Sequence, residues 1–148
     1  MFVFLLVCAI VATDQLTKWY IRKTMVPGEK KNLFPPKLIL WRIENTGVAY
    51  NTFKEKTKTV LFLSSSLFAG LIGNYFFMER GKKQVTEKLS FSFLLGGALG
   101  NLLDRVFRKS VTDFIFFKFK YGPIFNIADI FIVVGSIMTL IHRIKSEK

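Results

Sequence analysis

Cysteine and histidine are almost absent from this chain, and their scarcity excludes several classes of protein. The 148 residues include one cysteine, Cys8, and one histidine, His142. A single cysteine cannot form a disulfide within the chain, and the two residues together cannot build a Cys/His metal cluster. The sequence also lacks the His-Glu-x-x-His motif of zinc proteases. We therefore expect neither a disulfide framework nor a zinc hydrolase.

Acidic residues are scarce as well, with 10 Asp and Glu against 22 Lys and Arg and a formal net charge of +12. In a soluble protein, this charge would indicate nucleic-acid binding. However, 51% of the residues are apolar, and they form long runs with Lys and Arg between or beside them. This arrangement is typical of an integral membrane protein. We expect the basic side chains to meet anionic membrane lipids, with no nucleic acid as partner.

Four apolar segments approach the roughly 20 residues that a helix needs to cross a bilayer. They cover residues 2–21, 60–78, 89–107 and 124–144. The stretch 22–58 contains Pro and Gly turn residues followed by an alternating aromatic and β-branched run at 37–43, which predicts a short strand. The sequence therefore predicts an all-α membrane protein, a single domain over 1–148. Its four transmembrane helices would carry a small extracytoplasmic β-sheet cradle between the first two.

Two aspartates lie inside or beside these apolar segments. A carboxylate at membrane depth costs a few kcal/mol, so it indicates a functional site. Asp113 occurs in Val-Thr-Asp-Phe-Ile and Asp129 in Phe-Asn-Ile-Ala-Asp. Two carboxylates held close together do not both ionise, so one can take a proton from water while the other polarises a peptide carbonyl. That is aspartic protease chemistry, but a transporter's proton relay or structural polar contacts also fit these residues.

Other polar side chains share helix faces. Asp14 and Lys18 are four residues apart and can form an ion pair. This pair either ends the helix with Lys18 reaching the membrane interface or supports a site in the bundle. Asn101, Asp104 and Arg105 also share a face, where we favour a structural clamp between Asp104 and Arg105 at the helix end.

Asn126 precedes Asp129 by three residues, which places both on one face of the expected fourth helix. Nothing within that helix neutralises Asp129, so this carboxylate needs a partner from elsewhere. Asp113 could approach it at one membrane face. The alternative is an interhelical hydrogen bond to Asn101 or Arg105.

Five motifs lie in order along the chain: Asp14-Gln-Leu-Thr-Lys18, Asn45-Thr-Gly47-Val-Ala, Gly96-Gly-Ala-Leu-Gly-Asn101-Leu-Leu-Asp104-Arg105, Val111-Thr-Asp113-Phe-Ile and Phe125-Asn126-Ile-Ala-Asp129. Together they resemble the motifs of the lipoprotein signal peptidases, the signal peptidase II family of bacterial inner membranes. The length and the four apolar segments are also similar to those of the family. The resemblance covers the chain from the first segment to the last.

The resemblance implies an aspartic endopeptidase that removes signal peptides from prolipoproteins. Cleavage would fall just before a cysteine that carries a diacylglyceryl group. Asp113 and Asp129 would be the catalytic pair, with no metal and no organic cofactor, and globomycin would inhibit the enzyme. The residues implied to bind substrate or to support the site, Asp104 in a structural role, are Asp14, Lys18, Asn45, Gly47, Asn101, Asp104, Arg105 and Asn126.

The resemblance also implies a location in the bacterial inner membrane, with both termini in the cytoplasm and the active site toward the outer face. We expect a monomer. Charge counting disagrees on orientation, because 22–58 and 108–120 carry 13 Lys and Arg against 7 on the opposite side. Folded external segments translocate with little regard to charge, so we follow the resemblance. An outer basic collar would then attract anionic lipid and lipidated substrate through Lys30, Lys31, Lys54, Lys56 and Lys58.

One stretch departs from the family pattern. After Asn45-Thr-Gly47 the family usually continues Ala-Ala-Phe followed by Gly or Ser, whereas this chain has Val48, Tyr50 and Asn51 at the changed positions. These changes fall in the expected substrate-facing loop, so they affect selectivity and leave the chemistry intact.

Three other functions are alternatives to an aspartic peptidase: a transporter, a membrane scaffold and an intramembrane serine protease. A proton-coupled transporter is disfavoured because four segments without an internal repeat suit alternating access poorly. A membrane scaffold would tolerate asparagine at both Asp113 and Asp129. An intramembrane serine protease is disfavoured because the sequence has no Gly-x-Ser-Gly motif and only His142 as a possible base.

Overall fold

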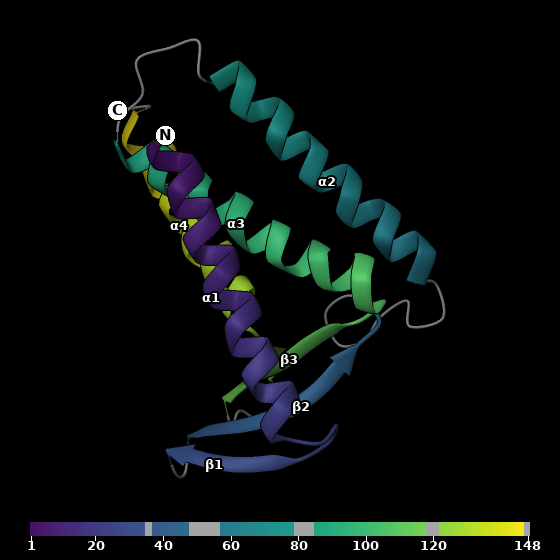
Figure 1. The fold of residues 1–148 in the computed structure, drawn as a ribbon. Coiled ribbons are helices and arrows are strands. Elements are labelled where there is room, and N and C mark those ends of the chain that lie inside the picture. The colour runs from purple at the N-terminus through teal and green to yellow at the C-terminus, as the bar shows by residue number, and fades with distance from the viewer. Residues whose placement is uncertain (35–36, 48–56, 79–84, 118–121, 147–148) are drawn as a thin grey trace.

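The computed structural model describes residues 1–34, 37–47, 57–78, 85–117 and 122–146. This part of the chain contains the helices α1 (Phe2–Thr24), α2 (Thr57–Met78), α3 (Val85–Arg108) and α4 (Ile127–Ser146). It also contains the strands β1 (Lys30–Phe34), β2 (Leu38–Asn45), β3 (Val111–Phe117) and β4 (Ile124–Phe125). Figure 1 shows α1, α3 and α4 packed together, with α2 set apart from them. Both termini lie at the end of the helices that is farther from the sheet.

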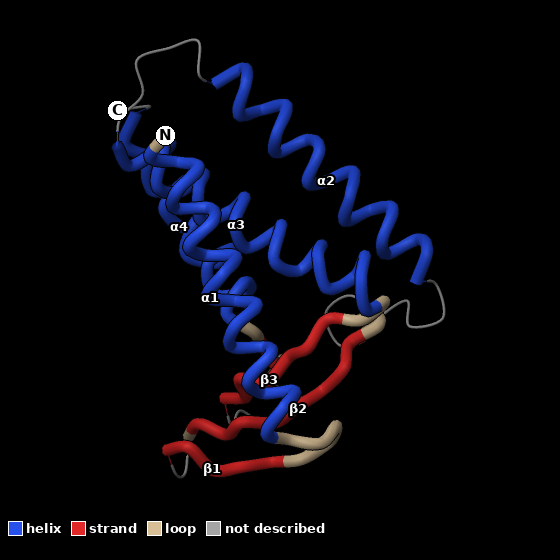
Figure 2. The backbone as a smooth tube through the Cα atoms, viewed as in Figure 1, coloured by secondary structure: helices blue, strands red, loops and turns tan. Residues whose placement is uncertain are grey.

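The strands form one antiparallel sheet in the order β1-β2-β3-β4 at one end of the helices (Figure 2). The sequence predicted a small sheet between the first two helices and placed one strand in it, at 37–43, which corresponds to β2. β3 follows α3 and pairs with β2 so that Ile43 lies opposite Asp113. β4 consists of Ile124 and Phe125 and pairs with β3. The fourth helix therefore begins at Ile127 and not at residue 124, where the sequence predicted its start. The sheet therefore ties the beginning of α4 to the segment that follows α1.

The helices occupy the four segments that were predicted as spans, with α1 running three residues farther, to Thr24. By length and composition, α1 and α4 are apolar enough to cross a membrane. Hydropathy thus supports two of the four predicted spans within the described residues. On α4, large apolar side chains point outward, among them Val133, Ile137, Leu140 and Ile144. Such surfaces are typical of contact with lipid or with another protein.

Polar side chains occupy much of the interior. Asp14, Lys18 and Asn126 are each 0% exposed, and Asp104 is 1% exposed. The buried apolar cluster is small and lies where the end of α1 meets the sheet, at Ile21, Met25 and Phe114. A buried polar group is costly unless it is paired. The packing of the helices is therefore tied to the pairing of these side chains.

Glycines allow α3 to approach its neighbours closely. A Cβ atom at Gly97 would lie 2.5 Å from the carbonyl oxygen of Ala128, and one at Gly100 would lie 2.7 Å from the Asp14 carboxylate. Small residues let helices pack where lipid removes most of the hydrophobic driving force. The close approach brings the beginning of α4 against both α1 and α3, where the buried polar side chains lie.

We expect Gly97→Ala to lower the Tm of the purified protein by about 2 to 12 °C, since overpacking against a backbone carbonyl costs about 1–3 kcal/mol and each kcal/mol lowers the Tm of a chain of this size by about 2–4 °C. Gly73→Ala on α2 is the matched control, because among the described residues no atom outside the adjoining helix backbone and the two neighbouring residues lies within 4 Å of a Cβ built there. Thermal unfolding in detergent measures both. Equal Tm values for the two variants would contradict the close α3–α4 packing.

Candidate active site

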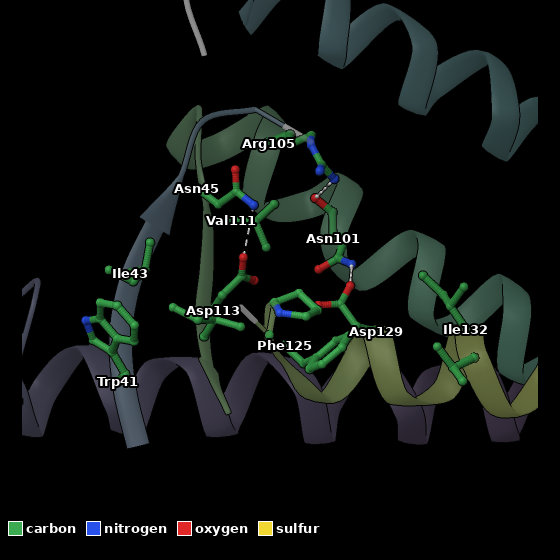
Figure 3. Close-up of a pocket in the computed structure, with 14 residues that line it drawn as sticks. Trp41, Ile43, Asn45, Asn101, Arg105, Val111, Asp113, Phe125, Asp129 and Ile132 are labelled. Atoms are coloured by element: carbon green, nitrogen blue, oxygen red, sulfur yellow. Dashed lines mark hydrogen bonds between the residues drawn. The ribbon is translucent and has the colours of Figure 1, made fainter. Parts of the chain in front are cut away.

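A cavity of about 530 Å³ lies where α3 and α4 meet the sheet (Figure 3). β2 contributes alternate residues, Trp41, Ile43 and Asn45, and β3 contributes Val111 and Asp113. Successive side chains of a strand point to opposite faces, so this two-residue period places one face of each strand toward the cavity. The remaining lining comes from α3, β4, the two residues before β4, and α4, and consists of Asn101, Arg105, Gly122, Pro123, Ile124, Phe125, Asp129, Ile132 and Val133.

Asp113 lies on β3 and is 4% exposed. Its two carboxylate oxygens accept hydrogen bonds from amide groups, Oδ2 from Asn45 at 3.1 Å and Oδ1 from Asn126 at 2.7 Å. Burial, and then the charge of Asp129, raise the pKa of Asp113 to about 7, although the two amide donors act in the opposite direction. A carboxyl group with this pKa is partly protonated at neutral pH and can donate a proton.

Asp129 lies in the first turn of α4, and Asn126 caps this helix. The Asn126 side chain accepts a hydrogen bond from the Asp129 N–H at 3.0 Å, and the Asp129 carboxylate accepts one from the Asn126 N–H at 3.0 Å. This reciprocal arrangement is a capping box. As expected, no basic side chain of the described part of α4 forms an ion pair with Asp129. The N-terminus of the helix nevertheless supplies a backbone donor and a favourable dipole. Asn126 is the cap of α4 and does not lie on a helix face with Asp129.

Asn126 and Asn101 connect the two carboxylates. Asn126 donates through Nδ2 both to Asp113 and, at 3.1 Å, to Oδ1 of Asn101. Asn101 in turn donates through Nδ2 to Asp129 Oδ1 at 2.8 Å. Figure 3 shows Asn45 reaching Asp113 and Asn101 reaching Asp129 at the cavity. The interhelical bond between Asn101 and Asp129, the alternative left open by the sequence, is thus present.

Arg105 and Asp104 point in different directions from α3. Arg105 lines the cavity and donates to the backbone carbonyl oxygens of Asn101 at 3.3 Å and Gly47 at 3.5 Å. Asp104 pairs instead with Lys18, at 3.0 Å. The predicted clamp between Asp104 and Arg105 is wrong, because adjacent residues on a helix do not face each other. Among the described residues, no carboxylate forms an ion pair with Arg105.

Lys18 lies behind the cavity among three polar partners. Its ammonium nitrogen is 2.8 Å from Asp14, 3.0 Å from Asp104 and 2.9 Å from Oδ1 of Asn101. The ion pair predicted between Asp14 and Lys18 is confirmed, but Lys18 is fully buried and does not reach the membrane interface. Asp14 also accepts the backbone N–H of Ala128 at 3.0 Å. The cluster therefore joins α1, α3 and α4.

Sequence reasoning missed several residues of this region. Gln15 donates to Asp14 and to the carbonyl oxygen of Gly100, both at 3.1 Å, which completes the contact of α1 with α3. The apolar wall formed by Trp41, Ile43 and Phe125 was also missed, although the alternation along β2 could have indicated it. Val48, Tyr50, Asn51, Lys54 and Lys56 lie outside the described residues, so the departures from the family motif and part of the basic collar are not placed.

Comparison with known proteins assigns the family. The family model for signal peptidase (SPase) II matches residues 6–145. This chain belongs to the signal peptidase II family. The lipoprotein signal peptidase of Clostridium novyi (strain NT) is 35% identical over 138 residues, which is 91% of this chain and 92% of that protein. The lipoprotein signal peptidase of Bacillus pumilus (strain SAFR-032) is 32% identical over 150 residues, which is 100% of this chain and 96% of the relative.

Solved structures agree with this assignment. A bacterial membrane enzyme determined by the in meso method at 2.3 Å resolution superposes with a TM-score of 0.88 and 30% sequence identity, over 99% of this chain and 89% of that one. A second, at 1.9 Å resolution, gives a TM-score of 0.85 and 31% identity, over 97% and 92%. This signal peptidase II family member is thus a membrane protein. Within its described part, no group of three or more His, Cys, Asp or Glu side chains could hold a metal ion.

The raised pKa of Asp113 predicts how stability depends on pH. Folding lifts this pKa from 3.8 to about 7, so ionised Asp113 opposes folding increasingly as the pH rises between these values. We expect Asp113→Asn to gain Tm relative to wild type as the pH is raised from 4 to 7, since each pKa unit corresponds to about 1.4 kcal/mol.

Thermal unfolding in detergent at several pH values measures this difference. Glu29→Gln on the β1 side of the molecule is the control, because Glu29 lies outside the cavity. A Tm difference between Asp113→Asn and wild type that stays constant from pH 4 to pH 7 would contradict the raised pKa.

Proposed function

We propose that this chain is an intramembrane aspartic endopeptidase. It removes signal peptides from prolipoproteins by cutting just before a cysteine that carries a diacylglyceryl group, and Asp113 and Asp129 form its catalytic pair. The observation that carries the proposal is the position of both carboxylates on one cavity, connected through Asn126 and Asn101. Membership of the signal peptidase II family supports the reaction and the substrate class.

The surroundings of the two carboxylates favour different roles. Asp129 accepts hydrogen bonds from Asn101 and from the backbone N–H of Asn126 at a helix N-terminus, so its carboxylate oxygens are held as acceptors at the cavity. We assign it as the base that takes a proton from water. Asp113 is buried with a pKa near 7, so it acts as the acid that donates a proton to the oxygen of the scissile carbonyl group.

The reaction then follows in two steps. Water attacks the carbonyl carbon while Asp129 takes its proton and Asp113 gives its own proton to the carbonyl oxygen, which yields a neutral tetrahedral diol. As the C–N bond breaks, Asp129 passes its proton to the leaving amine and Asp113 recovers a proton from the diol hydroxyl. Both carboxyl groups return to their starting states, and no further reactant is needed.

Other cavity residues would hold the peptide. Arg105 extends guanidinium donors over the cavity, where they could reach substrate carbonyl groups in place of Gly47. Trp41, Ile43 and Phe125 offer an apolar wall for the residues around the cut. Asn45 donates to Asp113 and accepts the backbone N–H of Gly47 at 3.0 Å, so it connects the acid to the loop beyond β2.

The proposal includes an arrangement in the bacterial inner membrane. All four helices would span it, with both termini in the cytoplasm and the sheet at the outer face, because the termini and the cavity lie at opposite ends of the helices. The exposed side chains of Lys30 and Lys31 on β1 would meet anionic lipid head groups there. The enzyme would act as a monomer without a cofactor.

The catalytic pair is tested with Asp113→Asn and Asp129→Asn. Each should lower kcat for cleavage of a diacylglyceryl-cysteine prolipoprotein peptide by about 100- to 10,000-fold, since each removes a positioned acid or base. Mass spectrometry of the products in detergent, where no ion gradient exists, measures the rate. His142→Gln is a control at the opposite end of α4, and inhibition of wild type by globomycin is a second one.

The two kinds of failure are distinct. If either folded aspartate variant kept near-wild-type activity, the assignment of the pair would be wrong. If the wild type itself did not cleave the lipidated peptide, the proposed activity would be wrong, and the transporter and scaffold functions would be favoured instead.

The roles within the pair are tested through pH dependence. Asn45 donates to Asp113 and lowers its pKa, so Asn45→Ala should raise that pKa. Because Asp113 acts as the acid, the alkaline limb of the kcat/KM profile should move to higher pH. Ile43→Val is the control, since Ile43 lies opposite Asp113 in the strand register and its side chain donates no hydrogen bond. A shift of the acidic limb instead would reverse the two assignments.

A further inference from the structure

We infer that Lys18 is a positioning residue for catalysis, which acts by fixing the orientation of the Asn101 amide so that its NH₂ group donates to Asp129. This inference rests on the proposed function and goes beyond the helix-pairing role of Lys18. Lys18 is 0% exposed and does not line the cavity, so it acts on the reaction through Asn101 and does not touch substrate.

The orientation follows from what an ammonium group can do. Lys18 only donates hydrogen bonds, so the atom of Asn101 that lies 2.9 Å from its nitrogen must be the amide oxygen. The NH₂ group of Asn101 then points the other way, 2.8 Å from Asp129 Oδ1. Asn126 donates to the same Asn101 oxygen at 3.1 Å and supports this orientation.

Lys18 is itself held in place by two carboxylates. Asp14 and Asp104 form ion pairs with its nitrogen at 2.8 Å and 3.0 Å, and Asn101 Oδ1 accepts its hydrogen bond at 2.9 Å. Within the described residues no hydrogen bond reaches the Asp104 oxygens. The two carboxylates therefore hold the ammonium group by charge at the position from which it donates to Asn101. The α1 helix thereby controls a contact between α3 and α4.

The reverse orientation of the Asn101 amide would prevent Asp129 from acting as the base. It would place the Asn101 oxygen against the Asp129 carboxylate, an arrangement that becomes favourable only when Asp129 carries a proton. Without Lys18, this second arrangement becomes accessible in a fraction of the molecules. Those molecules lack a base that can accept the proton of water.

The experiment must distinguish orientation of the Asn101 amide by Lys18 from a role in which Lys18 only balances the charges of Asp14 and Asp104. Lys18→Met by itself would leave Asp14 and Asp104 buried without their cation, which is strongly destabilising. We therefore make Lys18→Met in the Asp104→Asn background, where the three buried groups carry the net charge of −1 that they have in wild type. Asp104→Asn alone, with a net charge of 0, is the reference, and Lys18→Gln in the same background is the comparison of equal charge. Asp14 keeps its donors from Gln15 and Ala128 in all three proteins.

We expect Lys18→Met in the Asp104→Asn background to lower kcat about 10- to 100-fold while KM changes less than about 3-fold, since it removes one charge-assisted hydrogen bond to Asn101. Lys18→Gln in the same background keeps an N–H donor toward Asn101 and should restore kcat to within about 3-fold of the control. A loss confined to KM, or equal kcat with and without Lys18, would overturn the inference.

A double-mutant cycle of Lys18→Met with Asn101→Ala, both in the Asp104→Asn background, tests whether Lys18 affects kcat through Asn101. If Lys18 acts through the Asn101 amide, its removal costs no further kcat once Asn101 is alanine. A counter-ion role predicts the same loss in both backgrounds, and that result would overturn the inference. So would failure of both the Met and the Gln variants to fold, because Lys18 would then be required for folding itself. The proposed function is tested independently of Lys18: the wild type should cleave the lipidated peptide and Asp113→Asn should not, whatever the Lys18 variants do.

Discussion

The arrangement depends on one buried ion cluster, in which Lys18 of α1 lies between Asp14 of the same helix and Asp104 of α3. Removing one partner from such a pair leaves an uncompensated buried charge and typically costs about 3–5 kcal/mol. The Asp14 carboxylate also accepts the backbone N–H of Ala128 in α4. Three helices are therefore held in register by buried charges, in a chain that exposes many large apolar side chains on its helices.

The same contacts that hold the helices lead directly to the cavity. From Lys18, one hydrogen bond reaches Asn101 and the next reaches Asp129, while Asn126 connects Asn101 with Asp113. Buried polar networks are stabilising only when their members are satisfied together. A substitution at one of these positions is therefore felt both in the packing of the helices and in the orientation of the carboxylates.

Asp113 illustrates how the site differs from the rest of the interior. Burial and the neighbouring Asp129 raise its pKa to about 7, which disfavours its charged form at neutral pH. A residue chosen for stability alone would be apolar or fully paired at this position. Perturbed carboxyl groups of this kind are concentrated at functional sites because they can give and take protons near neutral pH.

The sequence by itself determined the approximate places of the four helices, one strand at 37–43 in a small sheet after the first helix, the ion pair of Asp14 with Lys18, and the two candidate catalytic aspartates. Hydropathy and spacing are local properties, so they can be read without knowledge of the fold. Only the tertiary structure decided that β3 and β4 complete the sheet, that Asn126 caps α4, and that Asp104 pairs with Lys18 and not with its neighbour Arg105. These outcomes depend on which distant segments of the chain meet in space, and this is not encoded in the spacing of residues along the chain.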